Sequence, residues 1–493
     1  MRQYPHLYEA NARIFLRRIS EKYKKGFTLS TIPNEEWRLL QRKGFDIIWL
    51  MGVWLRSPGA RQKALSGLVL RKEYEKTLSV WTAEDVAGSP YAIQAYTIDP
   101  ILGGEGELAQ LKSKLNRLGI RLLLDFVPNH LALDHTWTLS NPKWFVQGND
   151  DDAHAHPDWF FSPGHNIYLA HGRDPNFPPW SDTVQVNFYS TDMRKALIDE
   201  LLKISEIADG VRCDMAMLAL NDVFEKVWGR VIKDHSSLKV EFWAEAIGRV
   251  KQKRPDFLFL AEAYWGLEQK LQDVGFDFTY DKSLYDKLRF STPDDIRDHL
   301  IAGDSYQQHS VHFIENHDEL RAIIAFGLER SLAAGIILAT IPGLRLFHDG
   351  QLEGRRIHLP IQLVREPKEI DDLDTIRFYD RLMKICNAPA FHDGAWKLIE
   401  AGQGWEGNET HHNLLTWRWR YAEQVKIIVL NYSPAQSQGW LQLSLSLQKT
   451  ERAVLRDELT DVIYVRDTEE LRNRGLYVDL SPWHAHIFDI SAG

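Results

Sequence analysis

The chain has 493 residues, of which 44% are hydrophobic and 26% charged, and its formal net charge is −9. These values are typical of a globular protein with two or three domains, and the lack of a basic excess argues against a nucleic-acid partner. Two cysteines, Cys213 and Cys386, are too few for a disulfide framework and favour reduced thiols in a cytoplasmic protein. The first residues lack the apolar segment of a signal peptide, and no apolar run reaches 18 residues, so we expect no membrane partner.

Short apolar strands alternate with amphipathic helices through most of the chain. The expected strands cover residues 12–16, 46–51, 121–127, 210–213, 257–261, 276–280, 310–314 and 343–347. A helix is predicted over residues 34–43, with Trp37, Leu40 and Leu39 on its buried face, and another over residues 320–339. Near-continuous apolar runs are typical of parallel strands covered on both faces. Eight of them alternating with helices predict an α/β fold, a closed (β/α)8 TIM barrel.

Two regions depart from this alternation. Residues 131–190 are rich in Pro, Gly, Asp, His and Trp and are too many for a plain loop, so they predict an inserted subdomain after the third strand. After about residue 388, short strands joined by turn residues, one of them over residues 440–447, indicate a C-terminal all-β sandwich domain. We therefore expect a barrel of residues 1–130 and 191–388, an inserted subdomain of residues 131–190, and a sandwich of residues 389–493.

Charged and polar side chains follow four of the expected barrel strands. In (β/α)8 enzymes the chemistry takes place at the carboxyl ends of the strands. Taken singly, each of these groups is more simply a strand-end cap or a solvated charge, but together they indicate a site. The groups are Asp125 and His130 at the end of the third strand, Arg212 and Asp214 at the fourth, Glu262 at the fifth, and His317 and Asp318 at the seventh.

Carboxylates without cysteine ligands suit either a hard metal ion or paired-carboxylate chemistry. Retaining glycoside cleavage needs two carboxyl groups about 5–5.5 Å apart, one as nucleophile and one as acid/base, and neighbouring barrel strands can supply that spacing. Arg212 lies two residues before Asp214 and therefore points to the same side of its strand, where it can keep Asp214 ionised and aligned. This chemistry requires Glu262 to be protonated while Asp214 is ionised, so we expect one pKa to be raised and the other lowered.

Four short segments make a more specific comparison possible. The segments are DFVPNH, GVRCD, LAEA and FIENHD, beginning at residues 125, 210, 260 and 313. In this order they resemble the four signatures of the α-amylase family, glycoside hydrolase family 13. The family's layout of barrel, insertion after the third strand and C-terminal sandwich also matches the organisation expected above.

The resemblance implies roles for individual residues. Asp214 matches the catalytic nucleophile, Glu262 the general acid/base, and Asp318 the carboxylate that stabilises the transition state. The residues that match groups around the bound glucose are Tyr91, His130, Arg212 and His317. For Tyr91, plain packing is the alternative.

The resemblance also implies that Asn129 corresponds to a calcium ligand of many α-amylases, and the alternative is a side chain that only braces its loop. The chemistry itself requires no metal cofactor. Cys213 lies beside the nucleophile, but its side chain is expected to point to the opposite face of the strand and to serve as a small core residue.

Some segments differ from the family pattern. Met215-Ala-Met217 stands where starch-cleaving endo-amylases carry Lys-His, and Ala92 stands where many members carry Asp. These differences favour a short α-glucan or oligosaccharide substrate over bulk starch. Arg355 and Arg356, after the eighth strand, could contact a phosphate group, although a salt-bridged loop is the favoured interpretation.

The predicted function is a retaining glycoside hydrolase acting on α-glucosidic bonds. The first alternative is an α-glucan transglycosylase, because its chemistry is identical up to the glycosyl-enzyme. A non-catalytic carbohydrate-binding relative and an unrelated metal-dependent sugar isomerase are further alternatives. The sequence makes no prediction about the oligomeric state.

Overall fold

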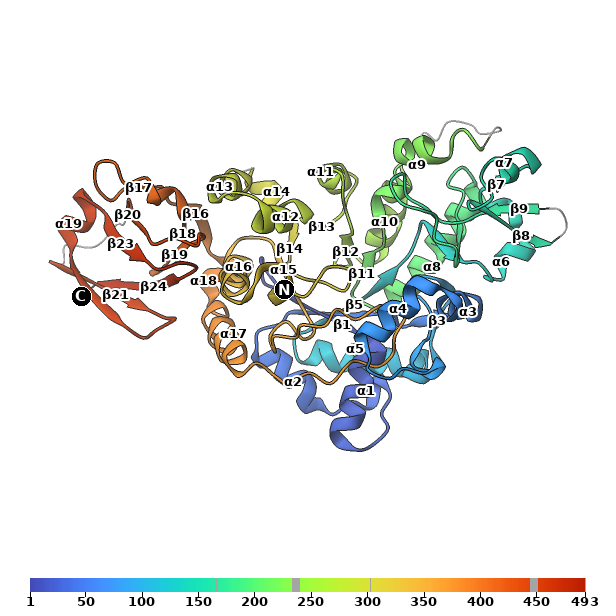
Figure 1. Ribbon diagram of the computed structural model, residues 1–493, viewed down its shortest axis with the longest axis horizontal. Helices are drawn as coiled ribbons and strands as arrows, with labels where there is room; N and C mark the ends of the chain where they lie inside the picture. The colour runs from blue at the N-terminus through green and yellow to red at the C-terminus, as the bar shows by residue number, and fades with distance from the viewer. Residues whose placement is uncertain (165–166, 233–239, 302, 444–450, 493) are drawn as a thin grey trace.

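A closed barrel of eight parallel strands forms the centre of the protein in a computed structural model (Figure 1). The structure describes residues 1–164, 167–232, 240–301, 303–443 and 451–492. The strands pair in the order β1-β15-β14-β13-β12-β11-β5-β2. Their bounds are β1 His6–Asn11, β2 Ile47–Met51, β5 Arg121–Phe126, β11 Gly210–Cys213, β12 Leu258–Ala261, β13 Phe278–Tyr280, β14 Ser310–His312 and β15 Leu344–His348.

The first barrel strand lies earlier in the chain than predicted. The expected strand at residues 12–16 is instead the first turn of α1 (Ala12–Tyr23), and β1 precedes it. The side chain of Asn11 accepts hydrogen bonds from the backbone nitrogens of residues 13 and 14 and so caps the helix. Phe15 and Ile19 then recur at helical spacing on its buried face.

Two predicted helices also differ in detail. In α2 (Asn34–Arg42), Trp37 and Leu40 are buried as expected, but Leu39 is 38% exposed because it falls outside the apolar stripe. The single helix predicted over residues 320–339 is divided at Gly327 into α15 (Ala322–Phe326) and α16 (Leu328–Thr340). Gly327 has φ +79°, a conformation that interrupts a right-handed helix.

The segment between β5 and α8 (Thr191–Ile207) forms small antiparallel sheets at one side of the barrel (Figure 1). In one sheet β6 (His130–Ala132) pairs with β10 (Thr183–Gln185). In the other, β9 (Ile167–Ala170) lies between β7 (Gln147–Gly148) and β8 (Phe160–Gly164). The β6–β10 pair holds the end of the third barrel strand and its following loop in place.

The C-terminal part of the chain consists of two antiparallel sheets, at the opposite end of the molecule from the inserted segment in Figure 1. The first has the order β16-β18-β19-β24-β21-β22 and the second β17-β20-β23. Their bounds are β16 Ala395–Leu398, β17 Ala401–Gln403, β18 Leu414–Tyr421, β19 Gln424–Asn431, β20 Ser437–Leu441, β21 Arg452–Asp457, β22 Ile463–Asp467, β23 Leu476–Leu480 and β24 Ala485–Ala492. Of the strand expected over residues 440–447, the last four residues lie outside the described part of the chain, and β20 ends at Leu441.

Among the described residues, none of the helices combines the length and the apolar character needed to cross a lipid bilayer.

Candidate active site

Asp214 follows the last residue of β11 and continues its pairing with the third barrel strand. Its backbone nitrogen donates to the carbonyl of Phe126 at 2.9 Å. Its carboxylate accepts a 2.7 Å hydrogen bond from Nη1 of Arg212, which comes from the same face of the strand as predicted. Cys213, between them, is fully buried among apolar side chains, so it is the core residue that the sequence indicated.

Glu262 occupies the equivalent position after β12. Its backbone nitrogen donates to the carbonyl of Cys213 at 3.0 Å. Its Oε2 atom lies 2.9 Å from Nη2 of Arg212 and accepts a 2.6 Å hydrogen bond from the backbone nitrogen of Met215. Its Oε1 atom accepts a 2.9 Å hydrogen bond from the hydroxyl of Tyr264.

A single buried guanidinium therefore bridges Asp214 and Glu262. The Arg212 side chain has no exposed surface, and its guanidinium carbon lies 5.2 Å from the ring centres of Trp49 and Tyr91. Burial alone would lower the pKa of Arg212, but Glu262 and the other neighbouring groups raise it well above its ordinary value. The cation is thus permanent and holds both carboxylates in fixed positions.

The sequence predicts that one of the two carboxyl groups has a raised pKa and the other a lowered one, and the structure agrees with only half of this. Burial raises the pKa of Glu262 to about 7, against the opposing effect of Arg212. Burial also raises the pKa of Asp214, and here too Arg212 acts in the opposite direction. The expected elevation at Glu262 is confirmed, whereas the expected depression at Asp214 is wrong because the loss of water around its carboxylate outweighs the arginine.

His317 contacts three polar side chains of the site: Glu9, Tyr91 and Asp318. Its Nδ1 atom lies 2.6 Å from Oε1 of Glu9, and its Nε2 atom lies 2.8 Å from the hydroxyl of Tyr91 and 3.1 Å from Oδ2 of Asp318. Burial opposes protonation of the imidazole, but Asp318 and Glu9 together raise the pKa of His317 to about 9. A charged imidazole can donate from both nitrogens and so fixes Tyr91 and Asp318 beside each other.

His130 approaches the same carboxylate as Arg212 but is neutral. Its Nε2 atom lies 3.9 Å from Oδ2 of Asp214, and its ring lies 4.9 Å from that of Trp180 in the inserted segment. Burial lowers the pKa of His130 to about 3. It can therefore offer a hydrogen bond to a sugar hydroxyl without adding charge.

Asn129 serves as a brace in this structure. Its Oδ1 atom, which a calcium ion would need as a ligand, accepts a 2.9 Å hydrogen bond from Nε2 of Gln185, and the same nitrogen lies 2.9 Å from the Asn129 carbonyl oxygen. Both side chains are buried. As placed, Asn129 ties β10 to the end of the third barrel strand.

Two contributors were missed by the sequence reasoning. Glu9 was not predicted because the expected first strand begins at residue 12, three residues after it. The structure places Glu9 on β1, inside the barrel. Tyr264 lies two residues after Glu262, the same spacing that identified Arg212 beside Asp214. Period-two alternation could therefore have found Tyr264.

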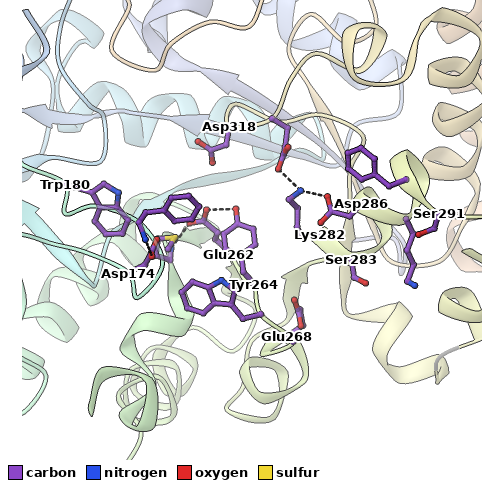
Figure 2. Close-up of a pocket in the computed structure, with 17 residues that line it drawn as sticks. Asp174, Trp180, Glu262, Tyr264, Glu268, Lys282, Ser283, Asp286, Ser291 and Asp318 are labelled. Atoms are coloured by element: carbon purple, nitrogen blue, oxygen red, sulfur yellow. Dashed lines mark hydrogen bonds and ion pairs between the residues drawn. The ribbon is translucent and has the colours of Figure 1, made fainter. Parts of the chain in front are cut away.

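A cavity of about 900 Å³ is lined by Glu262, by Asp318 and by residues that follow β12 and β13. Figure 2 shows Tyr264 next to Glu262, and Trp180 and Asp318 line the same cavity. Its other lining residues are Asp174, Phe177, Met215, Trp265, Gly266, Glu268, Lys282, Ser283, Asp286, Lys287, Phe290, Ser291 and Glu319. The cavity is large enough for several sugar rings and combines aromatic faces with hydrogen-bonding groups, as carbohydrate sites do.

Arg355 and Arg356 take part in a salt-bridged loop, as favoured from the sequence. Nη2 of Arg355 lies 3.0 Å from Oδ1 of Asp371, and Nη2 of Arg356 lies 3.6 Å from Oδ2 of Asp372. The backbone nitrogen of Arg356 also donates to Glu369 at 2.7 Å. Both arginines therefore stabilise the chain after β15.

Comparisons with known proteins identify the family of the chain. Residues 39–356 match the family model described as alpha amylase, catalytic domain. Alpha-amylase 3 of Dictyoglomus thermophilum is 24% identical over 355 residues, which are 64% of this chain and 65% of that protein. An alpha-1,4-glucan:maltose-1-phosphate maltosyltransferase of Bifidobacterium longum is 26% identical over 292 residues, 57% of this chain and 32% of that protein. The chain thus spans less than two thirds of the length of these relatives.

Among solved structures, the noncanonic maltogenic alpha-amylase AmyB of Thermotoga neapolitana has a TM-score of 0.69 and 18% identity, over 99% of this chain and 98% of that one. An alpha-amylase of Geobacillus thermoleovorans, solved in complex with acarbose, has a TM-score of 0.67 and 18% identity, over the same shares of the two chains. At these identities the likeness shows the fold. Since the family model covers well over half of the chain, the protein belongs to the α-amylase family, and the resemblance noted in the sequence is confirmed.

Proposed function

We propose that this protein cleaves α-glucosidic bonds of α-glucans or oligosaccharides with retention of anomeric configuration. The observation that carries the proposal is the bridge from one guanidinium to two carboxylates, Arg212 to Asp214 and Arg212 to Glu262. The terminal nitrogens of a guanidinium are close together, so the two carboxyl groups lie within the few ångströms that a retaining mechanism needs.

The first step forms a glycosyl-enzyme. The carboxylate of Asp214 attacks the anomeric carbon, while Glu262 donates its proton to the departing glycosidic oxygen. The bond to the leaving sugar breaks as the Asp214 ester forms, and Glu262 becomes a carboxylate. Asp318, whose side chain is 44% exposed and lines the cavity, can accept hydrogen bonds from ring hydroxyls as positive charge develops on the sugar.

In the second step Glu262 acts as the base. It removes a proton from water, whose oxygen attacks the anomeric carbon and displaces Asp214. The free sugar leaves with its original configuration, and both carboxyl groups return to their starting states. No metal takes part in either step, so we expect a chelator to leave the rate unchanged.

A transglycosylase is the second candidate, because the large cavity beside Glu262 could hold an acceptor sugar in place of water. Its described lining contains six carboxylates and two lysines: Asp174, Glu262, Glu268, Asp286, Asp318, Glu319, Lys282 and Lys287. An excess of negative charge disfavours a phosphorylated leaving group or acceptor. We infer that the group bound there is an uncharged sugar.

The test is incubation with maltose, maltoheptaose, soluble starch, pullulan, sucrose and trehalose, with chromatography of the products over time. Free glucose or short maltosaccharides alone indicate a hydrolase, and products longer than the input indicate a transferase. Proton NMR of the first product formed reports its anomeric configuration, and an initial β-anomer would contradict the retaining mechanism.

The two buried free cysteines support a reducing compartment, such as the cytoplasm, as the site of action.

A further inference from the structure

The chain between β15 and α17 (Leu373–Cys386) crosses the mouth of the barrel. We call this segment, residues 349–372, the strap. Figure 1 shows its orange trace between the region of α17 and α4 (Leu68–Thr77). Leu363 forms an antiparallel bridge with Val86. The backbone nitrogen of Ala87 donates to the carbonyl of Gln362 at 2.9 Å, on the same side of the crossing.

An ion pair locks the crossing. Nε of Arg365 donates to Oδ1 of Asp85 at 2.7 Å, and Nη2 donates to Oδ2 at 2.8 Å. Nη2 also donates to the carbonyl of Val80 at 2.7 Å. The hydrogen bond from Arg365 lowers the pKa of Asp85 to about 2, so the pair remains ionised at neutral pH. Two parallel bonds from one guanidinium fix the orientation of the strap as well as its position.

Apolar side chains also hold the strap against residues 74–86. Leu363 is fully buried and packs in one cluster with Tyr74, Leu78 and Val86. Tyr74 belongs to α4, part of the helical segment inserted before the β4 strand (Ile93–Ile98). The strap and this segment therefore form one continuous wall across the barrel mouth.

The inner surface of the wall contacts the sugar-binding groups directly. Nε2 of His358 lies 3.0 Å from the carbonyl oxygen of His317, and Nε of Arg321 donates to the carbonyl of Ile357 at 3.3 Å. The segment that the strap clamps, residues 85–87, leads within four residues to Tyr91, the hydroxyl partner of His317. The wall thus stands immediately behind the Tyr91–His317 pair.

Two cavities next to the His317–Asp318 segment differ greatly in volume. The cavity lined by His317 and by Ile357, Leu359 and Ile361 of the strap has a volume of about 30 Å³. That is room for one or two water molecules and not for a sugar ring. The cavity that contains Glu262 and Asp318 has about 900 Å³.

The acid Glu262 must lie on the side of the leaving group, since it protonates the departing oxygen. On the other side of the bond, the sugar attached to Asp214 would lie toward Tyr91 and His317, so any residues beyond its non-reducing end would meet the wall. We propose that the strap limits this side to a single glucosyl unit, so that the enzyme acts only at non-reducing ends and removes or transfers one glucose at a time. The inference rests on the proposed function and adds chain-end specificity to it.

The test uses two forms of p-nitrophenyl α-maltoheptaoside, one free and one blocked at its non-reducing glucose by a 4,6-O-ethylidene group, with p-nitrophenyl α-glucoside as a reference. A site that holds one unblocked glucosyl unit should cleave the free form, releasing glucose first, and should cleave the blocked form at least about 100-fold more slowly. Cleavage of both forms at similar rates, or maltose as the first sugar released, would overturn the inference.

Variants of the strap test whether it causes the slow cleavage of the blocked substrate. In Arg365→Ala or Asp85→Asn, the lock is lost, and we expect cleavage of the blocked form to rise toward that of the free form. Arg356→Ala is the matched control, because it lies on the same strap but pairs with Asp372 away from residues 80–87. If neither lock variant gains cleavage of the blocked form while both still turn over p-nitrophenyl α-glucoside, the strap does not set chain-end specificity.

The same substrates separate failure of the inference from failure of the proposed function. Turnover of p-nitrophenyl α-glucoside by the unaltered protein needs only the catalytic carboxylates and one glucosyl site. If that substrate and the free heptaoside are both untouched, the proposed function fails and the strap inference fails with it. If the heptaoside is cut internally, the proposed function stands and only the inference falls.

Discussion

At the scale of single residues, the site divides one task between two carboxyl groups that share an arginine. Arg212 contacts both, and Glu262 also receives hydrogen bonds from Met215 and Tyr264, but burial outweighs these contacts and raises its pKa to about 7. A group that titrates near the working pH can both give and recover a proton. Asp214 receives the shorter arginine contact and is suited to remain the anion.

The first prediction separates the roles of these two groups. Glu262→Gln should reduce cleavage of maltoheptaose by about 10²–10⁴-fold, because the departing oxygen is no longer protonated. The same variant should retain activity toward α-glucosyl fluoride, since fluoride leaves without a proton. Asp214→Asn is the matched control and should be inactive on both substrates, because no nucleophile remains. Equal losses on the two substrates in Glu262→Gln would refute the assignment of the acid.

The pH dependence follows from the same pair. Activity requires Glu262 protonated and Asp214 ionised, so kcat/KM should fall as the pH rises through about 7 and fall again as the pH drops through the pKa of Asp214. A bell-shaped profile of hydrolysis rates between pH 3 and 10 is the expected result. A rate that stays constant from pH 4 to 9 is incompatible with this pair.

Tyr264 offers a way to shift one limb of that profile. Its hydroxyl donates to Glu262, which favours the ionised carboxylate, so Tyr264→Phe should raise the pKa of Glu262 and move the alkaline limb to higher pH. The acid limb, which belongs to Asp214, should stay in place and serves as the internal control. A variant that loses activity with both limbs unmoved would show that Tyr264 acts only through packing.

At the scale of elements, most strands could be predicted because a buried parallel strand is an uninterrupted apolar run. Residues 210–213 and 257–261 have that form, and the structure places β11 and β12 there. The prediction of the first strand was wrong because the true strand, HLYEAN, mixes polar and apolar residues. The segment ARIFL after it is largely apolar but belongs to a capped helix. The polar strand is buried in the barrel, where Glu9 contacts His317, and a contact 308 residues apart leaves no local pattern in the sequence.

The candidate site could be located in the sequence because it lies at the ends of strands. Asp214, Glu262 and Asp318 were found from their positions after apolar runs, and the structure gathers them around Arg212 and His317. The strap could not be predicted, since its lock joins residues 85 and 365 through tertiary packing alone. Long-range clamps of this kind depend on the path of the chain and not on periodicity.

The turn into β15 gives a prediction at this scale. Gly343 has φ +101°, and a Cβ atom there would lie 2.6 Å from the carbonyl oxygen of Gln307 and 2.7 Å from that of Ser310. Gly343→Ala should lower the free energy of unfolding by about 2–4 kcal/mol, because backbone strain adds to overpacking. Gly119→Ala is the control: its φ is +74°, but no atom lies within 4 Å of the added Cβ, so only the smaller backbone cost of about 1 kcal/mol is expected. Equal shifts in the thermal midpoints of the two variants would rule out the clash.

At the scale of the whole molecule, the first C-terminal sheet is part of the barrel's core. Trp417 and Trp419 are fully buried and belong to the same apolar cluster as the barrel strands. Nε1 of Trp419 donates to the carbonyl of Thr340 at the end of α16 at 2.6 Å, and its ring lies 5.3 Å from that of Tyr4 before β1. The sheet therefore packs against the barrel between the end of α16 and the segment that precedes β1.

This sharing of a core predicts how the protein unfolds. Because the barrel and the first sheet bury one another's aromatic side chains, they should melt in a single calorimetric transition. Trp419→Ala should lower the stability of that transition by about 3–5 kcal/mol, the cost of removing a large buried ring. Trp440→Ala is the matched control, since Trp440 of β20 is only partly buried and packs against Arg474 and Tyr477. A Trp419→Ala protein whose barrel melts at the original temperature, while only a separate C-terminal transition shifts, would mean that the sheets fold as an independent unit.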